Sequence, residues 1–167
     1  MAGHKGKIVD FGSELHYEQM ADDFNALLNS LHISPAYITG WSDGGINGLL
    51  LAIRHPDKVK KLATTGANIV PGSTVLTPSA SALIRDNIAQ INAGKQDDYS
   101  RNTSKLLHMM EIEPQITPAD LKTIQCPVLV IGGDNDVIKP AHTLEIFENI
   151  PQAYLWILPA SGHGTVQ

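Results

Sequence analysis

Three side chains that can act together on a carbonyl group each follow a short apolar segment of this sequence. Ser42 comes first, Asp136 follows much later with Asp134 two residues before it, and His163 lies near the end. A serine hydroxyl is a weak nucleophile until a base accepts its proton, and a histidine oriented by a carboxylate is the usual base. The residue types therefore predict nucleophilic catalysis, provided that the fold brings them together.

The segment around Ser42, Gly-Trp-Ser-Asp-Gly at 40–44, has the context that an exposed serine nucleophile requires. It follows a short apolar run and opens a helical pattern. A serine on such a strand-to-helix turn is raised above the sheet, and we expect Gly40, Gly44 and Gly45 to let the strand and the helix approach each other. The same pentapeptide also occurs by chance in ordinary turns, so the interpretation depends on the rest of the chain.

The hydrophobic pattern predicts strands that alternate with helices. Such alternation is typical of an α/β protein with a parallel sheet and flanking helices, in which functional residues lie at the carboxyl ends of the strands. Ser42, Asp136 and His163 are therefore expected on one rim. We predict strands over 36–39, 59–65, 128–131 and 154–158, with a further short strand possible over 7–11, and helices over 17–32, 46–54, 79–92, 97–110, 117–121 and 141–149.

Length and composition predict a single domain. No Cys or His pair has the spacing of metal ligands, and we expect neither a metal nor a cofactor. The chain has 167 residues, 43% of them hydrophobic, with a net charge of -5 and one cysteine, Cys126. This charge argues against a nucleic-acid partner, and the lone cysteine, which we expect to be a packing residue, cannot form an internal disulfide. No apolar run approaches the roughly 20 residues that cross a bilayer, so we expect no membrane partner and a soluble, cytoplasmic protein.

Four motifs carry a resemblance to a known family. They are Gly-Trp-Ser-Asp-Gly-Gly at 40–45, Arg-His-Pro-Asp-Lys-Val at 54–59, Cys-Pro-Val-Leu-Val-Ile-Gly-Gly-Asp-Asn-Asp at 126–136 and Gly-His-Gly at 162–164. With these motifs the chain resembles the α/β-hydrolase superfamily, and within it the esterase and lactonase group that includes valacyclovir hydrolase-like α-amino-acid ester hydrolases. The order serine, acid, histidine along the chain is the order of the triad in that fold.

The resemblance implies a serine hydrolase that cleaves a small carboxylic ester or lactone through an acyl-enzyme. Ser42 is then the nucleophile and His163 the general base. Asp136 is preferred over Asp134 as the acid, because the family pattern places the acid at the second aspartate.

The two neighbours of Ser42 are the expected substrate-binding residues. The backbone N–H of Asp43 would be one donor of the oxyanion hole, as implied for the residue after the nucleophile. Its carboxylate could attract a cationic substrate group, and could equally be a solvated acid at a helix start. Trp41 precedes the nucleophile and is expected to contact the substrate.

The resemblance also implies that the chain holds the second half of the hydrolase sheet. Family members have further strands and a His-Gly type loop that donates a second oxyanion N–H, and a helix after the histidine. Residues 68–115 are expected to form a small helical cap insertion. The strand at 36–39 would be a bare edge, which predicts either a homo-oligomer or a separate segment that fills the gap. The alternative is a catalytically impaired fragment or non-catalytic binding module that needs another segment or partner.

Overall fold

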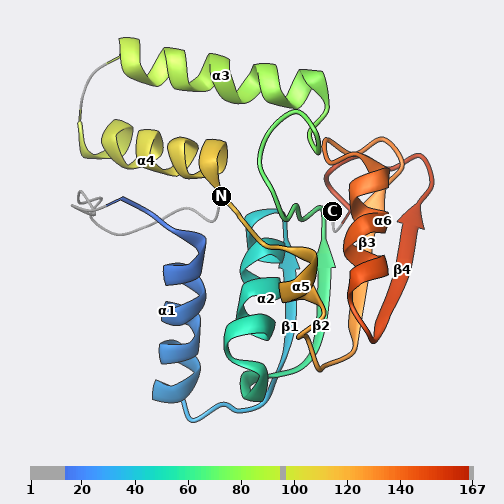
Figure 1. Cartoon of the computed structure of the whole chain (residues 1–167). Helices are drawn as coiled ribbons and strands as arrows, with labels where there is room; N and C mark the ends of the chain where they lie inside the picture. Colours follow the sequence, from blue (N-terminus) through green and yellow to red (C-terminus); the bar gives the residue numbers. More distant parts are fainter. Residues whose placement is uncertain (1–13, 95–96, 166–167) are drawn as a thin grey trace.

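A computed structural model describes residues 14–94 and 97–165 of the chain, and its centre is a parallel sheet (Figure 1). The possible strand at 7–11 lies outside the described residues. Four strands follow one another across the sheet in chain order, β1-β2-β3-β4, which confirms the predicted parallel arrangement. Their bounds are Ala36–Trp41 for β1, Val59–Thr65 for β2, Val128–Gly133 for β3 and Ala153–Leu158 for β4.

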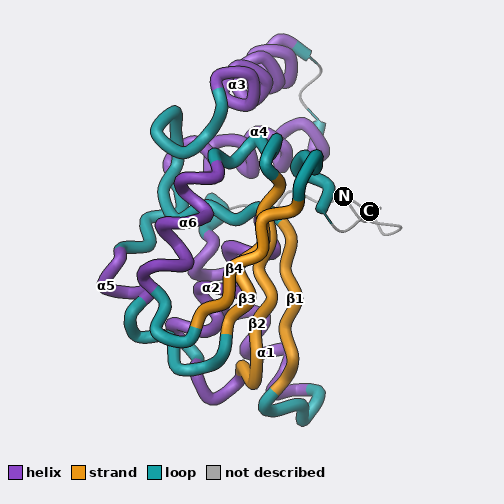
Figure 2. The backbone as a smooth tube through the Cα atoms, turned by 90° about the vertical axis from the view of Figure 1, so that its right-hand side faces the viewer, coloured by secondary structure: helices purple, strands orange, loops and turns teal. Residues whose placement is uncertain are grey.

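The predicted helices are present with small shifts at their ends. Helix α2 begins at Asp43, three residues before the apolar pattern starts at Ile46, because the turn after β1 leads directly into it. Helices α2, α5 and α6 lie on one face of the sheet (Figure 2), and α1 packs against α2. The helical bounds are Tyr17–Ser30 for α1, Asp43–Arg54 for α2, Pro56–Lys58 for the 3₁₀ turn η1, Pro78–Ala93 for α3, Asp98–Ile112 for α4, Pro118–Leu121 for α5 and Pro140–Asn149 for α6.

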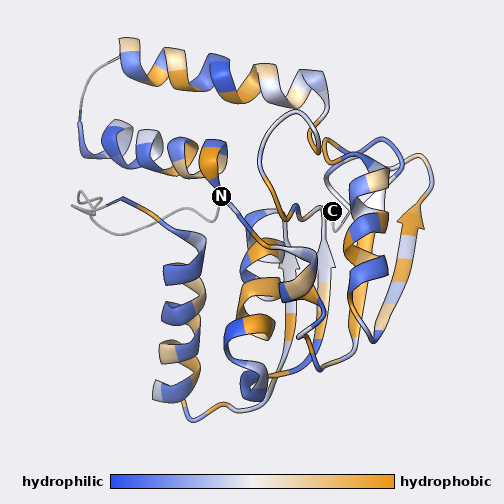
Figure 3. Ribbon diagram, in the orientation of Figure 1, coloured by the Kyte–Doolittle hydropathy of each residue, from blue (hydrophilic) through white to orange (hydrophobic). Residues whose placement is uncertain are grey.

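The core lies between this helical layer and the sheet. Leu49 of α2 is fully buried, and so is Val128 of β3, beside Leu62 and Val130, which point to the same face. Figure 3 shows the apolar residues gathered on α2 and β3 and the polar ones along α1. Each such aliphatic side chain stabilises the fold by about 1.5–3 kcal/mol when it leaves water. Cys126 is also buried, in agreement with a packing role.

The opposite face of the sheet carries apolar side chains that are exposed on its two outer strands. Trp41, Thr65, Ile131 and Trp156 form one row across the four strands, because each pairs in register with the next. Within the described residues no helix lies on this side of the sheet (Figure 2). As a result Trp156 is 55% exposed.

Helices α3 and α4 lie beyond the carboxyl ends of the strands, and they pack against each other (Figure 1). The side chain of Thr77 accepts a hydrogen bond from Ala80 N–H and caps α3, while Asp97 and Ser100 form a capping box at the start of α4. Such caps are typical helix start signals. Mixed apolar and polar residues follow both helices (Figure 3).

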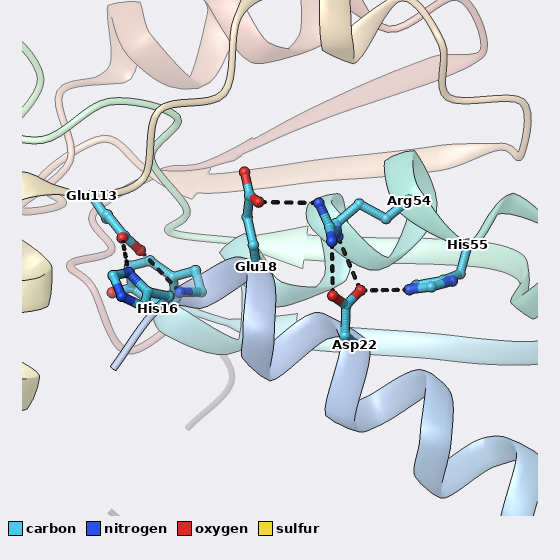
Figure 4. Close-up of polar contacts among 7 residues, drawn as sticks. His16, Glu18, Asp22, Arg54, His55 and Glu113 are labelled. Carbon is cyan, nitrogen blue, oxygen red and sulfur yellow. Dashed lines mark hydrogen bonds and ion pairs between the residues drawn. The ribbon is translucent and has the colours of Figure 1, made fainter. Parts of the chain in front are cut away.

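Hydrogen bonds connect the beginning of α3 and the end of α4 to the rest of the fold. Before α3, Thr77 N–H donates to the carbonyl oxygen of Val137. After α4, the carboxylate of Glu113 accepts from the Tyr17 backbone N–H at 2.9 Å and contacts His16 Nδ1 at 2.6 Å (Figure 4). The segment is therefore anchored to the rim and to the start of α1.

An ion-pair cluster joins α1 to the end of α2 (Figure 4). Arg54 binds Asp22 at 2.7 Å and Glu18 at 3.1 Å, and Asp22 also contacts His55 Nε2 at 2.7 Å. These side chains are partly exposed, so the cluster links α1 to α2 but adds little to stability.

Candidate active site

Ser42 occupies a sharp turn between β1 and α2. Its backbone has φ 54° and ψ -122°, a left-handed φ that is unfavourable for a residue with a side chain. The Ser42 N–H donates to the carbonyl oxygen of Thr65 at 2.9 Å, and the Ser42 carbonyl accepts from Gly45 and Ile46 N–H. The turn is therefore held from the neighbouring strand and from the helix that follows.

Two of the three glycines beside Ser42 are required by space. A Cβ on Gly40 would lie 2.1 Å from the carbonyl oxygen of Gly44, and one on Gly45 would lie 2.7 Å from Thr64 Oγ1. The expectation for Gly44 is wrong, because nothing lies within 4 Å of the position its Cβ would take. Close approach of strand and helix at this turn thus depends on Gly40 and Gly45.

The structure brings the three predicted side chains together. His163 Nε2 lies 3.0 Å from Ser42 Oγ, and His163 Nδ1 lies 2.7 Å from Asp136 Oδ1. An ionised carboxylate can only accept, so Nδ1 carries the proton and Nε2 is left to accept from the serine hydroxyl. The three residues follow β1, β3 and β4, as the rim argument predicts.

The carboxylate of Asp136 is fully buried, yet it remains ionised. Burial alone would raise its pKa, but hydrogen bonds from His163 and from the Ile138 N–H, at 3.0 Å, outweigh burial and hold the pKa below its ordinary value. Its second oxygen, Oδ2, has no hydrogen-bond partner among residues 14–94 and 97–165. The acid is thus fixed in place by the groups around Oδ1.

Asp134, the other candidate acid, has a different place. Its two carboxylate oxygens accept from the backbone N–H groups of Ala160 and Ser161, each at 3.0 Å, and these bonds lower its pKa. Asp134 therefore shapes the loop that leads to His163, while Asp136 contacts the imidazole itself.

Asp43 is held by a residue that the sequence did not indicate. The Tyr17 hydroxyl donates to Asp43 Oδ1 at 2.7 Å, and Asn47 Nδ2 donates to the Asp43 carbonyl at 2.9 Å. Tyr17 is buried, and burial together with the charges of Asp43 and Glu113 raises its pKa far above the ordinary value. The Asp43 backbone N–H lies in the first turn of α2, where amides have no partner within the helix.

Trp41 lies against the histidine. Its indole Nε1–H donates to the carbonyl oxygen of His163 at 2.6 Å. The centroids of the indole and imidazole rings are 5.5 Å apart, and the ring planes meet at 47°. The hydroxyl of Thr65 meets that of Thr165, two residues beyond His163. Neither contact was predicted, because both depend on the position of the loop after β4.

A family model described as alpha/beta hydrolase fold matches residues 4–105, more than half of the chain. The chain belongs to the α/β-hydrolase family. Human serine hydrolase BPHL is 23% identical over 92% of this chain and 57% of its own length. A pimeloyl-[acyl-carrier protein] methyl ester esterase of Chromobacterium violaceum is 30% identical over 86% of the chain and 68% of its own length.

A solved α/β-hydrolase structure supports the same assignment. The enol-lactonase from Burkholderia xenovorans LB400 has a TM-score of 0.67 and 25% identity, over 91% of this chain and 68% of that one. The chain therefore spans between about half and two thirds of the length of these relatives. The family resemblance and the fold class inferred from the sequence are confirmed.

In the part of the chain that the structure describes, no helix combines the length and the hydropathy needed to span a membrane.

Proposed function

We propose that this α/β-hydrolase is a serine hydrolase that cleaves a small carboxylic ester or lactone through an acyl-enzyme. The observation that carries the proposal is the chain of two contacts from Asp136 through His163 to Ser42. Such a constellation is recognised by geometry and roles, and not by sequence position. The names of the relatives, a serine hydrolase, a methyl ester esterase and an enol-lactonase, are consistent with it.

In this reaction Ser42 Oγ attacks the carbonyl carbon of the substrate while its proton passes to His163 Nε2. The tetrahedral intermediate collapses, the bond from the acyl carbon to the leaving oxygen breaks, and His163 returns the proton to that oxygen. Water then attacks the acyl carbon while its proton passes to His163. The bond to Ser42 Oγ breaks, His163 returns the proton to Oγ, and the carboxylic acid is released. Asp136 orients the imidazole and stabilises the imidazolium in both halves.

The oxyanion of the intermediate would be stabilised by the backbone N–H of Asp43. The positive end of α2 points at the same place, because Asp43 opens that helix. Loss of one such donor typically lowers turnover by about two to three orders of magnitude. The Tyr17 hydroxyl, by holding the Asp43 carboxylate, would keep this residue fixed.

Substrate selection is proposed for residues 68–115, as a cap over the rim, and for Asp43. Helices α3 and α4 lie beyond the strand ends where the triad is located (Figure 1). The Asp43 carboxylate uses one oxygen for Tyr17. Its other oxygen could take a cationic group of an amino-acid ester.

Covalent labelling with a fluorophosphonate tests the proposed function. The adduct should form on Ser42, as located by peptide mass spectrometry, and should vanish in Ser42→Ala and fall steeply in His163→Ala. Circular dichroism of each variant controls for folding. A folded wild-type chain that takes no label, or labels at another serine, would contradict the proposal.

A second candidate is a weakly catalytic or non-catalytic module of the same fold that pairs with a second copy of the chain. Strand β1 is an edge of the described sheet, and an apolar groove of about 310 Å³ lies beside it between α1 and α2. Tyr37 on this strand is 66% exposed. An identical edge can pair with itself about a two-fold axis.

Light scattering over a range of concentrations tests this pairing. Tyr37→Lys on β1 should shift the protein to monomer, since charge on an edge strand opposes pairing. Tyr154→Lys on β4 is the matched control, because Tyr154 is also 66% exposed. A wild-type chain that is monomeric at every concentration would rule out the second copy.

A further inference from the structure

Trp41 contacts His163 at both its backbone and its ring. The indole Nε1–H donates to the His163 carbonyl oxygen at 2.6 Å, and the ring lies 5.5 Å from the imidazole. Trp41 is also the last residue of β1, so it directly precedes Ser42. One side chain of the nucleophile's own strand therefore reaches the residue that must accept the nucleophile's proton.

The loop around His163 is held at other points, but these act on its neighbours. Asp134 binds the N–H groups of Ala160 and Ser161 before it, and Thr65 meets Thr165 after it. His163 itself is 25% exposed, which leaves its ring a free side toward solvent. The indole can therefore limit both the position of the His163 backbone, through its N–H, and the orientation of the imidazole, through its ring.

We propose that Trp41 is a positioning residue for His163, and that it sets the distance and angle between His163 Nε2 and Ser42 Oγ. This inference rests on the proposed function for the role of His163, although the contact can be tested without it. It differs from the expectation that Trp41 binds substrate, since the polar group of the indole is used within the protein. Because Trp41 is 39% exposed, it is the geometry of the two contacts, and not burial of the N–H, that supports this role.

Kinetics separate positioning from substrate binding. Trp41→Phe keeps a ring and loses the N–H, and Trp41→Leu loses both. We expect both the rate of fluorophosphonate labelling and kcat for p-nitrophenyl acetate to fall about tenfold to hundredfold, with KM nearly unchanged, because small misplacements of a catalytic base have effects of that size. Trp156→Phe, on the same face of the sheet, should leave both unchanged. A rise in KM at constant kcat, or unchanged labelling, would overturn the proposal.

Fluorescence tests the contact independently of activity. The chain has two tryptophans, so Trp156→Phe leaves Trp41 as the single reporter. An imidazolium beside an indole quenches the indole emission. When the pH is lowered and His163 takes up a proton, the Trp41 emission should therefore fall in a step. The step should disappear in Trp156→Phe/His163→Gln.

The other charged groups near this ring do not mimic that step. Asp136 contacts His163 Nδ1 and is held ionised, Asp134 binds backbone amides of the loop, and Asp43 bonds the Tyr17 hydroxyl. An identical pH response with and without His163 would overturn the contact. If Trp156→Phe shows the step but takes no fluorophosphonate, the proposed function would be contradicted and the contact supported.

Discussion

Two histidine–carboxylate pairs in this protein have the same separation and opposite surroundings. The distances from His163 Nδ1 to Asp136 Oδ1 and from His55 Nε2 to Asp22 Oδ1 are both 2.7 Å. The Asp136 carboxylate is fully buried, whereas that of Asp22 is 34% exposed. Among the contacts of the described residues, the second ring nitrogen of His163 contacts Ser42, and the second ring nitrogen of His55 does not. A candidate catalytic histidine therefore differs from a structural one in the burial of its acid and in the group at its second nitrogen. The distance between the imidazole and the carboxylate does not separate the two.

The charges around the two acids differ as well. Asp22 lies between Arg54 and His55, and the hydrogen bonds from these two side chains, with that of Arg54 first, lower its pKa to about 2. Its carboxylate is thus shared between a guanidinium and an imidazole at the surface (Figure 4). Within residues 14–94 and 97–165, Asp136 has the imidazole as its single side-chain partner.

The largest expected contrast comes from the same substitution at both acids. Asp136→Asn should lower the labelling rate of Ser42 by about four orders of magnitude, because an amide no longer selects the tautomer with Nε2 free to accept. Asp22→Asn is the matched control and should label at the wild-type rate. Labelling rates followed by intact-mass spectrometry give both values. Equal effects of the two substitutions would show that burial of the acid has no bearing on the base.

The rim itself could be predicted from the sequence, since it depends on local patterns. Ser42, Asp136 and His163 each follow an apolar strand, and parallel strands bring their carboxyl ends to one edge. Glycine punctuation and the alternation of strands with helices are read directly from the chain. The end of β1 was harder to predict from the sequence, because Gly40 and Trp41 belong to the strand only through their pairing with Thr64 and Thr65 of β2.

The supporting contacts could not be predicted, since they join residues that are remote in the chain. Tyr17 begins a helix whose apolar pattern indicates only a buried side, and its bond to Asp43 appears once α1 packs on α2. Thr65 and Thr165 meet across 100 positions, and Trp41 and His163 across 122. No spacing rule relates such pairs, because the sheet register decides them.

Two further histidine–carboxylate pairs should respond to pH with opposite signs. The His142 ring is buried, and burial lowers its pKa despite Glu145, while its Nε2 accepts from Ile69 N–H at 3.0 Å. The hydrogen bond to Glu113 and its charge raise the pKa of His16, which is exposed. Below about pH 6.5 the unfolded chain takes up a proton that folded His142 refuses, so this residue reduces stability as pH falls. His16 instead stabilises the fold below that pH, and its contribution is lost as pH rises.

Urea unfolding at pH 5.5 and pH 7.5 separates the two contributions. The loss of stability on acidification should be smaller in His142→Gln than in the wild type, and larger in His16→Gln. The effect at His142 should be the greater, since His16 is in contact with solvent. Parallel shifts in both variants would contradict the assigned directions.

The smallest expected effect is the loss of stability at the α1–α2 cluster. Asp22→Asn removes a partner of Arg54 and of His55, and partly exposed pairs of this kind contribute about 0.2–1 kcal/mol each. The lowered pKa of Asp22 means that its contribution is present above about pH 4 and is lost as pH falls toward 2. Added salt should screen it, because the Debye length shortens to about 3 Å at 1 M.

Asp23→Asn is the matched control for this cluster, because Asp23 lies on the same helix and bonds Gln19 instead. Urea unfolding at low salt should show Asp22→Asn less stable than Asp23→Asn, and the gap should close at 1 M salt. Labelling of Ser42 should be the same in both. A gap that persists in salt would mean that Asp22 acts through packing or hydrogen bonds rather than through charge, and that this surface pair resembles the buried one at the rim more closely than its exposure suggests.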